Sequence, residues 1–231
     1  MLRTIVSSFV TLATLASFAP LALAEQRAYE VRVTNVTRNQ SFTPILALAH
    51  DPSVRLFELG SPASPELAIL AEAGDTAPLA AVLQGQGALV GEVVQRPGLL
   101  MPGQTAVLTV TSGRGQTHLS MAAMLIPTND TFFAVNGLRL PTALRTVEVV
   151  ESPGYDAGSE ANDQNCARIP GPRCGGEGSS PESASDEGYV YIGNGFHELG
   201  TDDGAGNEVL RPLTYDWRNP VARIEVRRVA R

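Results

Sequence analysis

The most constraining feature of this sequence is a series of short strand-like runs separated at regular intervals by turn residues. In the clearest run, 105–111, Ala106, Leu108 and Val110 alternate with their neighbours Val107, Thr109 and Thr111. Side chains along a strand point to opposite faces in turn, so this alternation predicts a strand in a layered sheet. Runs at such short spacing favour antiparallel pairing in a sandwich or barrel over parallel βαβ units.

Further runs of the same kind extend over most of the chain. They cover 27–37, 43–49, 54–59, 89–94, 118–126, 132–138, 144–150, 189–192 and 221–227. Two Ala/Leu-rich stretches, 66–73 and 78–83, predict short helical pieces, and the prolines between Pro62 and Pro65 give the first a start. The pattern therefore predicts an all-β fold with short helices.

The composition changes between Gly154 and Gly188. This stretch is rich in Gly, Pro, Ser, Asp and Glu and contains few apolar residues. We interpret it as a long loop insertion that is partly disordered or ordered only by a ligand. A second polar stretch, 201–208, lacks the full spacing of a calcium loop and is predicted to be a solvated hairpin loop.

The N-terminal segment has the pattern of a secretory signal peptide. Arg3 precedes an apolar run from Ile5 to Leu23, and Ala22-Leu23-Ala24 forms an A-x-A cleavage site. The alternative is an N-terminal membrane anchor, but the cleavage site lies where a stop-transfer flank would be needed. We therefore predict a signal peptide over 1–24, a single β domain over 25–231 and an exported protein, periplasmic or extracellular, with no transmembrane segment in the mature chain.

Charge and cysteine content narrow the possible partners and the compartment. The net charge is −7, which disfavours nucleic acid or an anionic membrane as a partner. Cys166 and Cys174 are the only cysteines, and they flank a turn-rich segment. Since export implies an oxidising compartment, we favour a local disulfide over free thiols. Two cysteines at this spacing supply too few ligands for zinc.

Two acidic turns are the main clue to function. The stretches 126–133 and 155–163 each place carboxylates beside a strand that is predicted to be buried. Carboxylates on neighbouring loops of a rigid sheet commonly hold a hard cation such as Ca²⁺. Without further information, however, Asp130 could simply cap a turn, because Asn-Asp is ordinary turn chemistry.

Three motifs in order resemble the spondin N-terminal domain family, in its bacterial branch. They are 120–130, ending in Pro-Thr-Asn-Asp; 155–158, Tyr-Asp-Ala-Gly; and 215–223, Tyr-Asp-Trp-Arg-Asn-Pro-Val-Ala-Arg. Animal members of the F-spondin and mindin type are extracellular-matrix proteins. The resemblance covers essentially the whole mature chain, and it implies an antiparallel β-sandwich similar to C2-type domains with Ca²⁺ at one edge.

The resemblance also implies a set of metal ligands. Asp130 and Asp156 match the two family aspartates, and a backbone carbonyl that follows the first would fall near Phe132. Animal members take a further carboxylate from an upstream strand, but the comparable stretch here, 107–112, has no acidic residue. Glu160, Asp163 or water could take that place.

The combined prediction is an exported calcium-binding module for adhesion or binding, with a protein or carbohydrate surface as partner. No G-x-S-x-G or H-E-x-x-H motif is present, so we expect no enzymatic activity. The alternatives are a secreted hydrolase that uses the ion as a Lewis acid and a metal-free structural envelope protein. Loop aromatics either anchor a partner or cover the edge of the core; they are Tyr155, Tyr189, Tyr191, Phe196, Tyr215 and Trp217.

Overall fold

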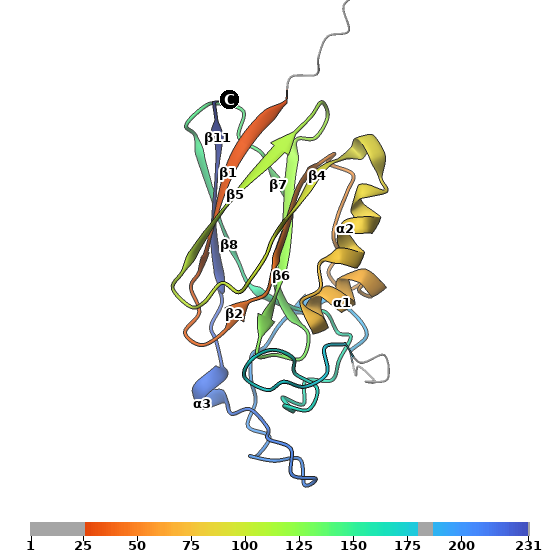
Figure 1. Ribbon diagram of the computed structural model, residues 1–231, viewed down its shortest axis with the longest axis vertical. Coiled ribbons are helices and arrows are strands. Elements are labelled where there is room, and N and C mark those ends of the chain that lie inside the picture. Colours follow the sequence, from red (N-terminus) through yellow and green to blue (C-terminus); the bar gives the residue numbers. More distant parts are fainter. Residues whose placement is uncertain (1–25, 180–186, 231) are drawn as a thin grey trace, which may run out of the picture.

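Two antiparallel sheets form the body of the protein in the computed structural model, which describes residues 26–179 and 187–230. The predicted signal peptide lies outside the described residues. The smaller sheet has the order β5-β1-β11-β8, with strands β5 (Thr105–Ser112), β1 (Arg27–Asn35), β11 (Ala222–Val229) and β8 (Val147–Ser152). Figure 1 shows it as one layer of the sandwich.

The larger sheet has the order β10-β9-β7-β6-β3-β4, and β2 pairs with β6 beside that path. Its strands are β10 (Tyr191–Ile192), β9 (Gly154–Asp156), β7 (Thr131–Arg139), β6 (His118–Ile126), β3 (Ile45–His50), β4 (Val90–Arg96) and β2 (Ser41–Phe42). Both sheets consist of antiparallel pairs, so the predicted all-β sandwich is confirmed.

Helices cover the outer face of the larger sheet. α1 (Pro65–Ala73) and α2 (Ala77–Gln84) agree with the two predicted helical pieces, and η1 (Gly87–Leu89) and α3 (Pro212–Tyr215) are short additions. The side chain of Ser64 caps α1 by accepting a hydrogen bond from the Leu67 amide. Figure 1 shows α1 and α2 packed along one side of the sandwich.

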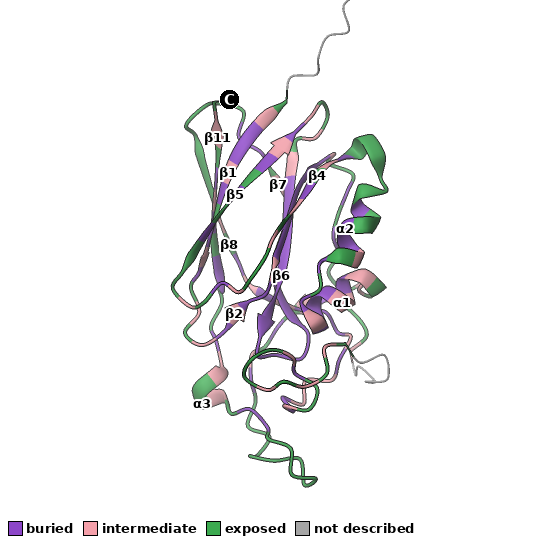
Figure 2. Cartoon of the chain, in the orientation of Figure 1, coloured by how far each residue is buried: buried purple, intermediate pink, exposed green. Residues whose placement is uncertain are grey.

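The helical cover explains why β3 and β6 read as apolar runs and not as alternating strands. Ala47 and Met121 face the core between the two sheets, whereas Leu46 and Ala122 face the helices. Every residue of β3 is buried, because both faces of this part of the sheet are covered. Figure 2 shows the continuous burial of β6.

Two segments differ from the sequence prediction in their secondary structure. Residues 54–59 form no strand; Val54 and Leu56 pack beneath the helices, while the Leu56 amide donates to the Asn136 side chain. The predicted strand 144–150 begins only at Val147, since the preceding Arg145 has a φ of 68°. Val54 and Leu56 are buried although their backbone is irregular, whereas Leu144, Val147 and Val149 are exposed.

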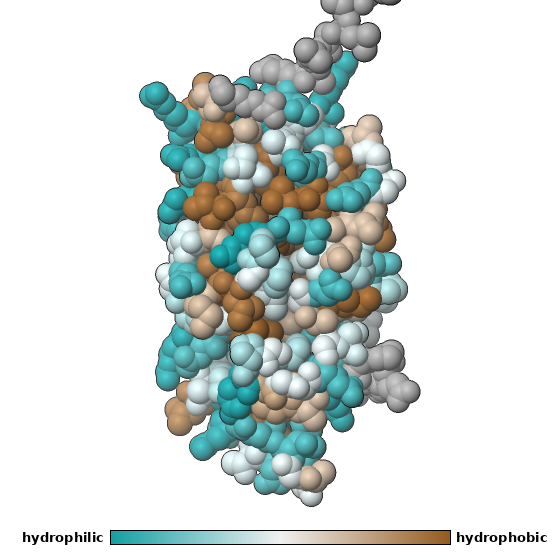
Figure 3. Space-filling model, in the orientation of Figure 1, coloured by the Kyte–Doolittle hydropathy of each residue, from teal (hydrophilic) through white to brown (hydrophobic). Residues whose placement is uncertain are grey.

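The segment after Gly154 is the largest departure from the prediction. Its described part, 154–179, is a folded structure that contains β9 and buries Glu160, Gln164 and Ile169. Side-chain hydrogen bonds and a disulfide order it, and composition alone did not show these. The loop 201–208 is exposed, as expected. Figure 3 shows mostly hydrophilic and weakly apolar side chains at the lower, loop-bearing end.

Candidate functional site

The two acidic turns meet at one end of the sandwich because their strands pair. β7 starts at Thr131, directly after Asp130, and Thr131 lies opposite Asp156 at the end of β9. The amide of Ala157 also donates to the Asp130 carbonyl, with an N···O distance of 3.2 Å. Asp130 and Asp156 are therefore neighbours in space although 26 positions separate them in the sequence.

Asp130 fastens the turn to the following loop. Its Oδ2 accepts hydrogen bonds from the amides of Ser159 at 2.8 Å and Glu160 at 3.0 Å, and from the Ser159 hydroxyl. Its Oδ1 is buried and has no hydrogen-bond partner among the described residues. Burial and the nearby charge of Asp156 raise the pKa of Asp130 to about 8. Such a carboxylate is unfavourable in its charged form unless a cation compensates it.

Asp156 is also buried, but both of its oxygens have protein partners. Oδ1 accepts from the Gly158 amide at 2.9 Å, and Oδ2 accepts from the side-chain amide of Asn162 at 2.9 Å. Burial raises the pKa of Asp156, with the charge of Glu187 adding to the effect. A carboxylate oxygen has further lone pairs, so these bonds orient Asp156 without excluding a cation.

Glu160 is the second carboxyl group with free oxygens. It is 1% exposed, and neither of its carboxylate oxygens has a hydrogen-bond partner among the described residues. Burial raises the pKa of Glu160 to about 8, and the charges of Glu72, Asp130 and Asp163 contribute further. Buried carboxylate oxygens are normally hydrogen-bonded, so the side chain of Glu160 is a candidate for binding a ligand, while its amide bonds Asp130.

Asp163 has a different environment, since protein groups occupy both of its oxygens. Oδ1 accepts from the side chain of Asn129 at 3.0 Å and from the Asn165 amide, and Oδ2 forms an ion pair with Arg168. This arrangement links the loop to the Asn129 turn. Asp163 as a metal ligand stays a prediction. The Phe132 carbonyl also stays a prediction; Phe132 lies inside β7, which pairs with β6 on one side and β9 on the other.

The number of converging side chains is limited. Within 26–179 and 187–230, no group of three or more His, Cys, Asp or Glu side chains is arranged to hold a metal ion. Asp130 and Asp156 form a closely interacting pair, and their donor chemistry suits a hard cation such as Ca²⁺. A calcium ion at this pair would need backbone carbonyls or water for the rest of its shell.

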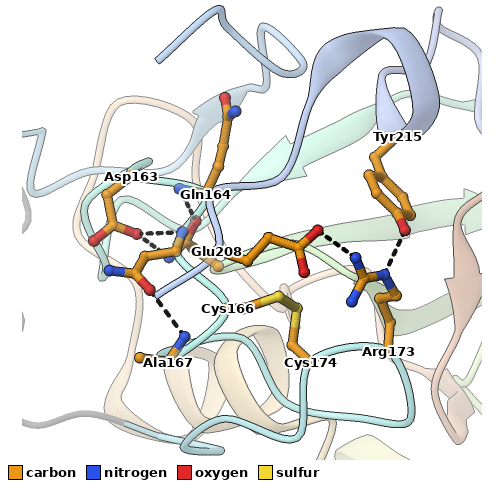
Figure 4. Close-up of a disulfide and its surroundings, with 10 residues drawn as sticks. Asp163, Gln164, Cys166, Ala167, Arg173, Cys174, Glu208 and Tyr215 are labelled. Atoms are coloured by element: carbon orange, nitrogen blue, oxygen red, sulfur yellow. Dashed lines mark hydrogen bonds and ion pairs between the residues drawn. A yellow bond between two sulfur atoms is a disulfide. The ribbon is translucent and has the colours of Figure 1, made fainter. Parts of the chain in front are cut away.

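A disulfide stabilises the lower part of the same loop. Cys166 and Cys174 are bonded, as predicted. Beside them Arg173 pairs with Glu208 and donates from Nε to the Tyr215 hydroxyl at 2.6 Å. Figure 4 shows how these contacts connect the loop to the chain before β11. No local sequence pattern predicts the Arg173 contacts, because the partners of Arg173 lie 35 and 42 positions away.

Gly158 explains why the second motif requires glycine. Its φ is +62°, and a Cβ placed there would lie 2.3 Å from the carbonyl oxygen of Tyr189. The loop thus passes directly against the backbone before β10, and only glycine fits.

Of the loop aromatics, Phe196 and Trp217 cover the core edge, whereas Tyr189 is exposed.

One serine–histidine pair resembles the nucleophile and base of a hydrolase, but it is not accessible to solvent. Nε2 of His50 lies 2.8 Å from the Ser120 hydroxyl, while Nδ1 contacts the Asp51 carbonyl. Both side chains are completely buried between β3 and β6, and the Ser120 oxygen accepts from the Gly137 amide. The geometry is that of a satisfied buried pair, which a substrate cannot reach.

An antiparallel β-sandwich with acidic loops at one end is thus the class that the fold and the site define. Comparison with protein families gives a match to the Spondin_N family over residues 29–163, and the chain belongs to this family. The match ends before the disulfide, so the third motif, 215–223, lies outside it. No curated protein matches the chain.

The family and the disulfide are compatible with an extracellular or exported protein that acts as a binding module. Within the described residues, no helix is long and apolar enough to cross a membrane.

Proposed function

We propose that the protein is an exported binding or adhesion module in which Ca²⁺ joins the Asp130 turn to the Asp156 loop. The observation that carries this proposal is the buried Oδ1 of Asp130, which has no hydrogen-bond partner among the described residues. Leaving such an oxygen unpaired is costly, and Asp156 beside it adds a second negative group. A divalent cation compensates both.

The residues around the proposed ion would have different roles. Asp130 and Asp156 would hold the ion, and backbone carbonyls or water would complete its shell, because no third acidic side chain in 26–179 and 187–230 is arranged with them. When bound, the ion supplies positive charge and a fixed coordination geometry. The amides of Ser159 and Glu160 orient Asp130. Asn162 orients Asp156.

The loop end also offers a surface for a partner. Several large apolar side chains lie exposed on the segments that follow the acidic loop: Tyr189, Ile192, Leu199 and Leu213, the last being 75% exposed. Exposed aromatic and aliphatic groups of this kind anchor protein or carbohydrate partners. We propose that calcium fixes this surface, and that the protein works in the periplasm or outside the cell without catalysing a reaction.

The test compares thermal stability with and without calcium. Saturating Ca²⁺ should raise the melting temperature, because an ion that binds only the folded state at 100 times its Kd stabilises it by about 2.7 kcal/mol. For a domain of this size, that corresponds to roughly 5–10 °C. Asp130→Asn with Asp156→Asn should abolish the shift. Asp202→Asn, a change in the exposed loop 201–208, should leave it intact.

The alternatives give different results in the same material. An identical melting curve in calcium and in chelator, with no calcium retained in equilibrium dialysis, would support the metal-free envelope protein. Turnover of an ester, phosphoester or glycoside that disappears in Asp156→Asn would support the hydrolase.

A further inference from the structure

A pocket lies at the end of the sandwich opposite the acidic loops. It is a cavity of about 290 Å³ at the start of β1, the β5–β6 turn and the end of β7. Three arginines, Arg27, Arg114 and Arg139, belong to its lining, and Tyr29 and Leu140 supply apolar surface. Because β6 and β7 run from one end of the sandwich to the other, this pocket lies roughly 25–30 Å from Asp130.

No acidic residue lines this pocket, and its three arginines belong to none of the described ion pairs. None of the residues that line it is Asp or Glu. The described ion pairs use five other arginines: Arg168, Arg173, Arg218, Arg223 and Arg227. In an acidic protein without lysine, three arginines around one cavity are an unusual local excess of positive charge.

The positive charge of the arginines also acts on a titratable group near the pocket. Burial lowers the pKa of His118, at the start of β6, and the charges of Arg55 and Arg139 lower it further. Asp51 is the nearby opposing charge, with its Oδ2 4.0 Å from a Cβ placed on Gly115. Its Oδ1 accepts bonds from Ser53, so the carboxylate is held in its own turn.

We propose that this pocket binds the dianionic phosphate group of a small phosphomonoester. Planar guanidinium groups form paired hydrogen bonds with phosphate oxygens, and three of them match a dianion better than a single carboxylate. The cavity is near the lower limit of about 300 Å³ for small-molecule sites, which suits a compact ligand.

The experiment titrates the full chain with glucose 6-phosphate, inorganic phosphate and glucose by calorimetry and amide NMR. The buffer contains chelator and little salt, since phosphate precipitates calcium and salt screens the arginines. Both phosphates should bind saturably in the millimolar range or tighter, and glucose should not bind. The amide shifts should concentrate in the 112–117 turn.

Matched variants locate the site. Arg114→Gln with Arg139→Gln should weaken phosphate binding at least tenfold, whereas Arg114→Lys should weaken it less because the charge remains. Arg38→Gln changes an exposed arginine beyond the other end of β1 and should have no effect. Asp51→Asn should strengthen binding. Melting curves of each variant show whether it is folded.

Two results would overturn the proposal. One is the absence of saturable phosphate binding by the folded wild-type chain. The other is equal binding by Arg38→Gln and by the Arg114/Arg139 double variant, which would show adventitious contact with surface arginines. Neither result bears on calcium at Asp130, because the titration is made without it.

Discussion

The two ends of the sandwich carry opposite kinds of ionisable side chain, carboxyl groups at one end and arginines at the other, and the two sets differ in burial. At the acidic end, Asp130, Asp156 and Glu160 are buried, and backbone amides and an asparagine hold the first two in place. At the other end, Arg114 and Arg139 are exposed side chains around an open pocket. The comparison shows that β6 and β7 place two chemically distinct sites on one rigid body.

Because the carboxyl groups at the acidic end are buried, substitutions there should disturb the surrounding structure. The Ala157 amide donates to the Asp130 carbonyl, and β9, which leads into this loop, pairs with β10. A change in one of these segments should therefore displace the others. The arginine end contains long side chains on turns, which can move without disturbing a strand. Substitutions should therefore affect stability at the first end and binding at the second.

The largest effect is expected from Gly158→Ala at the acidic end. The new Cβ would meet the Tyr189 carbonyl in a left-handed backbone conformation, so we expect a loss of roughly 2–4 kcal/mol of unfolding free energy. Urea unfolding measures it. Gly204→Ala is the control, because Gly204 has a φ of +78° but open space around its Cβ position. An equal loss in both variants would show that backbone conformation alone matters and that the close contact does not.

An intermediate effect should come from pH through His50, which lies near the arginine end. Burial lowers the pKa of His50, so the folded protein keeps this imidazole neutral while the unfolded chain binds a proton below about 6.5. Stability from this group is complete above that pH and falls as pH decreases, by at most about 1.4 kcal/mol per pH unit.

The measurement for His50 is urea unfolding between pH 7.5 and 5.5 in wild type and His50→Gln. The difference between the two proteins isolates this group from the carboxyl groups at the acidic end, which also titrate. The wild type should lose more stability than the variant on acidification, and parallel curves would contradict the assignment.

The smallest effect is expected from Arg114→Gln on stability. This exposed side chain forms no described ion pair, so the unfolding free energy should change by less than about 0.5 kcal/mol. The same variant should nevertheless bind phosphate more weakly. A loss of stability comparable to that of Gly158→Ala would remove the distinction between the two ends.

The alternating runs predicted an antiparallel sandwich or barrel, and the family resemblance selected the sandwich. The Ala/Leu-rich stretches predicted α1 and α2, because local periodicity reports which faces are buried. The same signal failed at 54–59, where apolar residues pack under the helices in an irregular path. It failed also after Gly154, since that loop is ordered by polar contacts that have no periodicity.

For the candidate site, the sequence by itself determined the residue types: Asp130, Asp156 and the glycine at 158, together with two cysteines able to pair. Only the tertiary structure decided how the carboxylates differ in burial and in hydrogen-bond partners. The carboxylate oxygens of Glu160 are buried without a hydrogen-bond partner among the described residues, while the carboxylate of Asp163 is bound to Asn129 and Arg168. The arginine pocket likewise exists only after folding, because strand pairing joins residues 27, 114 and 139. Local sequence specifies chemistry, whereas burial and proximity are properties of the packed chain.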